Sequence, residues 1–140
     1  MSDTDIPTLL KTYDLSVAIE HRTLCRSLSI SMSAGETWSI LGPNGSGKTT
    51  LLETLAGLRP PQSGEVLIDG RPSSSLSPRQ LALRRSMLFQ KTDVAFPATV
   101  IETVISGRHP HVPNWQTETR EDFDIARQAL LKVDLAGFEE

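Results

Sequence analysis

Cysteine is almost absent from this sequence, because Cys25 is the only one among 140 residues. An internal disulfide is therefore impossible, which agrees with a reducing compartment. The ordinary interpretation of Cys25 itself is a small buried apolar side chain. A chain of this length forms one domain at most, and it is long enough to bury most of its apolar surface around a single core.

Long apolar runs and runs of basic residues are missing as well. Residues 1–5 are acidic and no apolar stretch follows them, so we expect neither a signal peptide nor a transmembrane helix. Fourteen basic residues against seventeen acidic ones give a net charge of −3, and no basic stripe is present for nucleic acid or an anionic membrane surface. We therefore expect a cytoplasmic protein with no nucleic-acid partner and no direct membrane insertion.

The most informative motif is GPNGSGKT at residues 42–49, which fits the pattern G-x-x-x-x-G-K-[S/T]. A strand-like run at 37–41 leads into it and a helix-like run at 49–56 leads out. Glycines let the backbone wrap a phosphate with its N–H groups inward, the helix N-terminus adds its positive dipole end, and Lys48 brings a full charge. Thr49 offers a hydroxyl to Mg²⁺. The flanking elements favour a phosphate site over a chance match.

Hydrophobic periodicity and capping signals predict the other elements. Strands are expected at residues 9–17, 28–32, 65–68 and 87–89, the last of them beside 37–41 in a parallel sheet. A turn at Asp69 and Gly70 closes the third of these strands. Helices are expected at 49–56 with a stop at Gly57, at 78–85 behind the capping residues Ser77 and Gln80, at 99–107 behind Thr99 and Glu102, and at 123–133 behind Glu121 and Asp122.

Three stretches resemble the ATP-binding subunits of ABC transporters in their order and spacing. They are LGPNGSGKTTLL at 41–52, LAGLRPPQSGEVLIDG at 55–70, and SMLFQ, which ends at Gln90. The resemblance covers residues 9–137 and implies an α/β P-loop NTPase fold of ABC type, with a parallel-sheet core and an antiparallel β subdomain. It makes residues 1–140 a partial ATP-binding domain, incomplete at the C-terminus. The Leu-Ser-Gly-Gly signature loop, the Asp-bearing Walker B strand with its catalytic Glu, and the switch His lie downstream in this family.

The resemblance also implies which residues form the site. Lys48 and the backbone of residues 45–50 would hold the β- and γ-phosphates of ATP, and Thr49 would ligate Mg²⁺. Gln90 would be the Q-loop glutamine, which reaches the metal and the attacking water and links the site to the membrane subunit. Without the family, Gln90 is an ordinary polar residue that ends a strand. The implied nucleotide-binding set is Gly42, Pro43, Asn44, Gly45, Ser46, Gly47, Lys48, Thr49 and Thr50, and the implied catalytic residues are Lys48 and Gln90.

The implied function is ATP binding and hydrolysis that energises an importer. Its partners would be a membrane permease subunit and a second ATP-binding subunit in a homodimer, so the protein would lie at the inner face of the cell membrane through the permease. The stretch TVIETVISGRHPH at 99–111 resembles the ATPases of iron-chelate, haem and cobalamin importers. Alternatives are a module that binds nucleotide without hydrolysing it and an ABC-type ATPase outside transport. A GTPase is disfavoured, because no Asn-Lys-x-Asp motif follows the loop.

Two further features stay open at this point. His109, His111 and Trp115 suggest a metal site, but two histidines in a Pro-rich loop supply too few convergent ligands. Members of the family place an aromatic ring on adenine shortly after the first strand, and here that position falls on Ile19 or its neighbours Glu20 and His21. Tyr13 is out of register for this role, which leaves the usual aromatic contact with adenine open.

Overall fold

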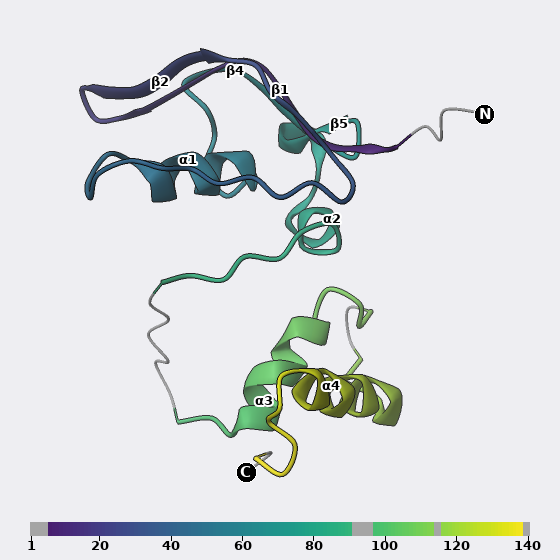
Figure 1. The fold of residues 1–140 in the computed structure, drawn as a ribbon. Coiled ribbons are helices and arrows are strands. Elements are labelled where there is room, and N and C mark those ends of the chain that lie inside the picture. Colours follow the sequence, from purple (N-terminus) through teal and green to yellow (C-terminus); the bar gives the residue numbers. More distant parts are fainter. Residues whose placement is uncertain (1–5, 91–96, 114–115, 139–140) are drawn as a thin grey trace, which may run out of the picture. The chain divides into compact units, whose positions relative to one another are not determined.

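The computed structural model describes residues 6–90, 97–113 and 116–138, drawn in colour in Figure 1. They form two compact units, Met1–Met87 and Leu88–Glu140. Trp115 of the suggested metal site lies outside the described residues. None of the helices in the described part is both long and apolar enough to cross a lipid bilayer.

The first unit contains an antiparallel sheet. Its strands are β1 (Thr8–Ile19), β2 (Arg22–Leu28), β3 (Ser31–Ser33), β4 (Ser63–Ile68) and β5 (Arg71–Pro72), in the order β2-β1-β4-β5 with β3 also paired to β1. The strands predicted at 9–17 and 65–68 are confirmed as β1 and β4. So is the turn after β4, where Asp69 and Gly70 have φ angles of 48° and 72° that suit the β4–β5 hairpin.

A buried threonine divides the strand that was predicted at 28–32. The side chain of Thr12 is 1% exposed, and its hydroxyl donates to the carbonyl of Leu28 at 2.8 Å and accepts from the N–H of Ile30 at 3.1 Å. The backbone N–H of Thr12 also donates, to the carbonyl of Ile30 at 2.9 Å. The hydroxyl thus takes the place of ladder bonds at this point, and β2 and β3 are separate strands on either side of it.

The strands predicted at 37–41 and 87–89 are wrong, since neither segment is in a strand of this structure. A strand needs a hydrogen-bonded neighbour, and the structure gives these segments no ladder partner among the described residues. Leu41 is 90% exposed and Leu88 is 96% exposed.

The segment at 37–41 follows a polar turn, where Glu36 Oε2 accepts from the N–H of Ser33 at 2.9 Å and from Trp38 Nε1 at 3.0 Å. These two hydrogen bonds lower the pKa of the Glu36 carboxyl, and the bond from Ser33 has the larger effect.

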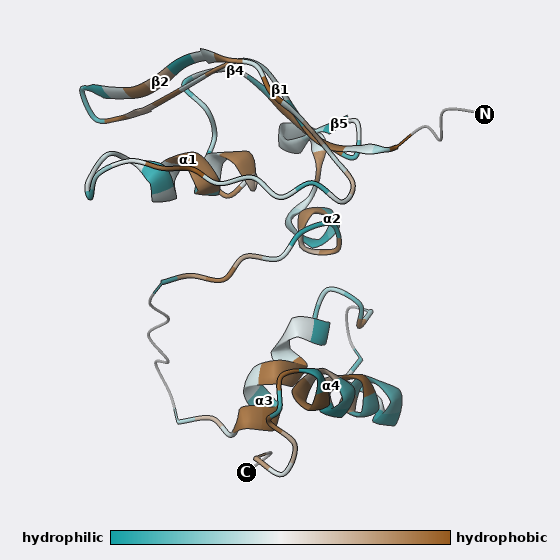
Figure 2. Ribbon diagram, viewed as in Figure 1, coloured by the Kyte–Doolittle hydropathy of each residue, from teal (hydrophilic) through white to brown (hydrophobic). Residues whose placement is uncertain are grey.

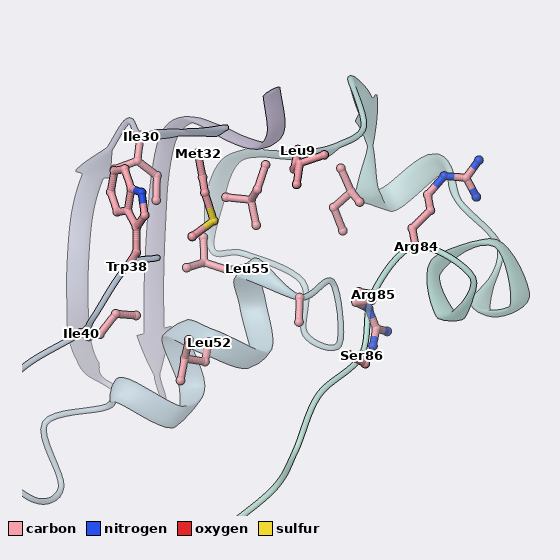
Figure 3. Close-up of a pocket in the computed structure, with 13 residues that line it drawn as sticks. Leu9, Ile30, Met32, Trp38, Ile40, Leu52, Leu55, Arg84, Arg85 and Ser86 are labelled. Carbon is pink, nitrogen blue, oxygen red and sulfur yellow. The ribbon is translucent and has the colours of Figure 1, made fainter. Parts of the chain in front are cut away.

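The core of the first unit lies between the sheet and α1 (Lys48–Leu55), which runs beneath the strands in Figure 1. A cavity of about 440 Å³ remains beside it. Figure 3 shows the residues that line this cavity, with Leu9 on β1, Met32 on β3, Ile30 between β2 and β3, and Leu52 and Leu55 on α1. The first unit also contains the 3₁₀ turn η1 (Ser73–Ser75) and the helix α2 (Pro78–Ala82), which ends three residues earlier than predicted.

The second unit contains two packed helices. They are α3 (Val100–Ile105), continued by the 3₁₀ turn η2 (Ser106–Arg108), and α4 (Arg120–Lys132). Figure 2 shows hydrophobic residues over most of α3, whereas α4 alternates hydrophobic and hydrophilic residues. Ile105, Ala126 and Leu130 are buried in this unit. Both helices were predicted, but the expected stop at Gly107 was not observed, because that residue lies inside η2.

Candidate functional site

The motif at residues 42–49 forms a compact loop that opens into α1. Gly45 and Gly47 have φ angles of 75° and 96°, a region that favours glycine. The loop is closed by a bond from the Ser46 N–H to the Pro43 carbonyl at 3.3 Å. The Lys48 side chain folds back over it, with Nζ donating to the carbonyls of Gly42 at 2.8 Å and Pro43 at 2.7 Å. A cation is thus held at the loop rather than in solvent.

The start of α1 differs from the start of the other α-helices described. Ser77, Thr99 and Thr119 cap α2, α3 and α4, each in a capping box with the residue three positions on. The cap of α1 is Gly47, which has no side chain to offer, and its first turn contains no acidic residue. The first N–H groups of a helix have no intrahelical acceptor and carry a positive partial charge. This helix start is therefore suited to an anion such as phosphate.

The two threonines after Lys48 have different surroundings. Thr49 is exposed, whereas Thr50 is 8% exposed and its carbonyl accepts from the hydroxyl of Thr54 at 2.8 Å. No group of three His, Cys, Asp or Glu residues in the described ranges converges on one point. Mg²⁺ typically uses one or two protein ligands together with phosphate oxygens. The Thr49 hydroxyl fits such a shared coordination, in which the protein supplies few ligands.

Two residues of β2 contact the loop, and sequence analysis missed both. Arg22 Nη1 donates to the Gly45 carbonyl at 3.1 Å. Leu24 lies against Gly47, where a Cβ atom would be only 2.6 Å from the Leu24 Cδ1 and Cδ2 atoms. Both contacts join residues 23 positions apart, so no local sequence signal could have identified them.

The adenine position predicted from the resemblance falls at the β1–β2 turn. Ile19 ends β1, Glu20 has a φ angle of 51°, and His21 precedes β2. Tyr13 is 47% exposed on β1, with Lys11 Nζ 4.7 Å from the centre of its ring. A lysine thus already covers one face of the only tyrosine in the sequence.

Gln90 lies in the second unit and is exposed. Its role therefore stays a prediction.

A polar network also lies in the second unit. His109 Nε2 is 2.9 Å from Glu118 Oε1, which gives this histidine a carboxylate partner. Asp122 accepts from the Thr119 N–H at 3.0 Å, from the Thr119 hydroxyl at 2.8 Å, and from Arg108 Nε at 2.9 Å. These bonds, in that order of importance, hold the pKa of Asp122 at about 2, below its usual 3.8. The network joins η2 to the start of α4.

Comparison with known proteins agrees with this geometry. The family model described as "ABC transporter" matches residues 25–140. The hemin import ATP-binding protein HmuV of Rhizobium meliloti (strain 1021) is 41% identical over 130 residues, which are 93% of this chain and 48% of that protein. HmuV of Burkholderia ambifaria is 38% identical over 134 residues, 90% of this chain and 49% of that protein. The chain spans about half the length of the curated relatives it matches.

Solved structures show the same fold. A nucleotide-free ATP-binding cassette from an ABC transporter has a TM-score of 0.75 at 23% identity, over 94% of this chain and 56% of that one. An ATP-binding cassette in a post-hydrolysis state, bound to ADP and Pi, has a TM-score of 0.73 at 24% identity, over 94% and 60%. The ABC-type P-loop fold inferred from the sequence is therefore confirmed.

Proposed function

We propose that this chain, which belongs to the ABC transporter family, binds ATP with Mg²⁺ at residues 42–50 and is part of an ATP-hydrolysing subunit that energises an importer. The observation that carries the proposal is the start of α1. It is the described α-helix that lacks a side-chain cap, and it opens directly from a glycine loop that holds a lysine. Phosphate is the ligand that such a combination suits.

In this proposal each group has a defined role. Lys48 leaves the carbonyls of Gly42 and Pro43 and pairs with the phosphates, and the N–H groups of residues 45–50 donate to them. Thr49 and, as the family resemblance implies, Gln90 would hold Mg²⁺, which when bound would neutralise charge on the phosphates. Phosphoryl transfer depends mainly on positioning and on such charge neutralisation. Gln90 additionally orients water and couples the site to the membrane partner.

The importer and its substrate class are inferred from the relatives. Several of them are named as hemin import ATP-binding proteins, in agreement with the stretch at 99–111 that resembles importers of iron chelates, haem and cobalamin. We infer a haem-type substrate, a permease partner, a second ATP-binding subunit as homodimer partner, and a position at the inner face of the membrane through the permease.

Nucleotide binding without hydrolysis is the second candidate. One observation favours it, because the groups that the described residues bring together, the uncapped start of α1 and Lys48 at the glycine loop, are groups that bind phosphate. A single-turnover assay separates the two candidates. Magnesium-dependent release of phosphate from bound ATP supports hydrolysis by this chain, whereas stable bound ATP supports the binding module.

The test of the proposed site is displacement of a fluorescent ATP analogue from the full chain. Lys48→Ala should weaken binding about ten- to hundredfold, because a charge-assisted hydrogen bond contributes roughly 1.5–3 kcal/mol. Lys132→Ala, which removes the same charge from the last turn of α4, is the matched control and should leave affinity unchanged. Equal affinity in Lys48→Ala and Lys132→Ala would exclude residues 42–50 as the phosphate site.

A further inference from the structure

Arg22 lies outside the motif at residues 42–49 but contacts the loop that the motif forms. Arg22 begins β2 and its Nη1 donates to the carbonyl of Gly45 at 3.1 Å. Its side chain is exposed, and no carboxylate in the described part of the chain pairs with it. An exposed arginine without an acidic partner that bonds a loop carbonyl 23 residues away is not explained by surface solvation alone.

Through the planar peptide bond, this contact also fixes the direction of the Ser46 N–H. In a trans peptide the C=O and the following N–H point in opposite directions, because the six atoms lie in one plane. The structure contains no cis peptide bond among the described residues. When Arg22 holds the Gly45 carbonyl, the N–H of Ser46 is directed to the opposite side of that peptide, where it meets the Pro43 carbonyl at 3.3 Å.

The ammonium group of Lys48 meets the same acceptor as the Ser46 N–H. Lys48 Nζ lies 2.7 Å from the Pro43 carbonyl that accepts from Ser46. The Ser46 N–H and the Lys48 ammonium therefore share one acceptor, and a phosphate oxygen in its place would receive both donors. Leu24 lies against Gly47, so β2 contacts the loop at two points, through Arg22 and through Leu24.

We propose that Arg22 is a positioning residue of the phosphate loop, which fixes the Gly45–Ser46 peptide so that its N–H faces the bound polyphosphate. The inference rests on the proposed function and adds a residue from the β1–β2 hairpin to the site. It concerns the phosphates, so it applies equally to ATP and to inorganic tripolyphosphate, which has no base.

The test compares Arg22 variants of the full chain, with displacement of a fluorescent ATP analogue by ATP and by tripolyphosphate. Arg22→Ala and Arg22→Met, which remove the donor, should weaken both ligands by the same factor, about three- to tenfold, as expected for one lost hydrogen bond. Arg22→Lys keeps a cationic donor and should restore most of the affinity. Arg26→Ala removes the same charge from an exposed position on β2 and should change neither ligand.

Thermal unfolding without ligand completes the test. Positioning predicts that Arg22→Lys and Arg22→Met unfold at the same midpoint but differ in tripolyphosphate affinity. Unchanged tripolyphosphate affinity in Arg22→Met would overturn the inference, and so would a loss confined to ATP, which would place Arg22 at the base. If Lys48→Ala weakens binding and the Arg22 variants do not, only this inference fails. If the unaltered chain binds neither ligand, the proposed function fails.

Discussion

Leu24 on β2 fills the space that a Cβ atom on Gly47 would need, with its Cδ1 and Cδ2 atoms 2.6 Å from that position. Gly47 is also the cap of α1 and has a φ angle of 96°. The strand and the helix start therefore meet at a glycine for two separate reasons, which are steric contact and backbone conformation. Substitutions at the two residues can distinguish these reasons.

Gly47→Ala should weaken ATP binding about tenfold, because strain of roughly 1–3 kcal/mol at a positive φ is added to the contact with Leu24. The double variant Gly47→Ala with Leu24→Ala should recover only part of this loss, since the backbone strain remains. Leu24→Ala alone is the reference. The measurement is displacement of the fluorescent ATP analogue, and wild-type affinity in Gly47→Ala would contradict the described loop.

Gly64→Ala should strongly destabilise the first unit. Gly64 has a φ angle of 81°, and a Cβ atom there would overlap the backbone carbonyl of Asp14 on β1. We expect a loss of about 2–4 kcal/mol in the free energy of unfolding, measured by urea denaturation. Gly70→Ala has a similar φ of 72° but open space around the new methyl group, so about 1–2 kcal/mol of strain is expected. Equal losses in both variants would mean that the approach of β4 to Asp14 is not tight.

Asp122→Asn should lower stability in a manner that depends on pH. The folded-state pKa of Asp122 is about 2 and the usual value is 3.8, so the charged carboxylate stabilises the folded state. This contribution is fully present above about pH 4 and is lost as pH falls through about 2. The difference in urea midpoint between wild type and Asp122→Asn should shrink over that window. Asp124→Asn, at an exposed position two residues on, is the matched control for the removal of one carboxylate.

Gln90→Ala, made in a longer protein that contains this chain, should leave ATP binding nearly intact while lowering turnover and its stimulation by the membrane partner. The reason is that Gln90 is assigned to metal, water and coupling rather than to the phosphates. Gln128→Ala on the exposed side of α4 is the control. The assignment is wrong if Gln90→Ala loses ATP affinity as strongly as Lys48→Ala.

Local signals in the sequence predicted what depends on neighbouring residues. The capping boxes at Ser77 and Thr99 and the turn at Asp69 and Gly70 are formed within four residues, and the structure contains them. The box at Thr119 has the same spacing to Asp122 and could have been identified in the same way. These features need no information about the fold.

Features that depend on distant residues were not predictable. The segments 37–41 and 87–89 have the composition of buried strands, yet pairing requires a neighbour that composition does not specify. The division between β2 and β3 depends on the hydroxyl of Thr12, and the support of the phosphate loop depends on Arg22. In these last two cases the decisive partner is at least sixteen residues away.

The uncapped start of α1 has a dynamic consequence. Helices α2, α3 and α4 each carry a cap side chain that accepts from one amide of the first turn, so this amide is protected whenever the helix is folded. The first turn of α1 has no such acceptor among the described side chains, and we expect it to fray. Hydrogen–deuterium exchange at Lys48, Thr49 and Thr50 should therefore be fast in the free chain and slow with ligand. These three amides would report occupancy of the loop directly.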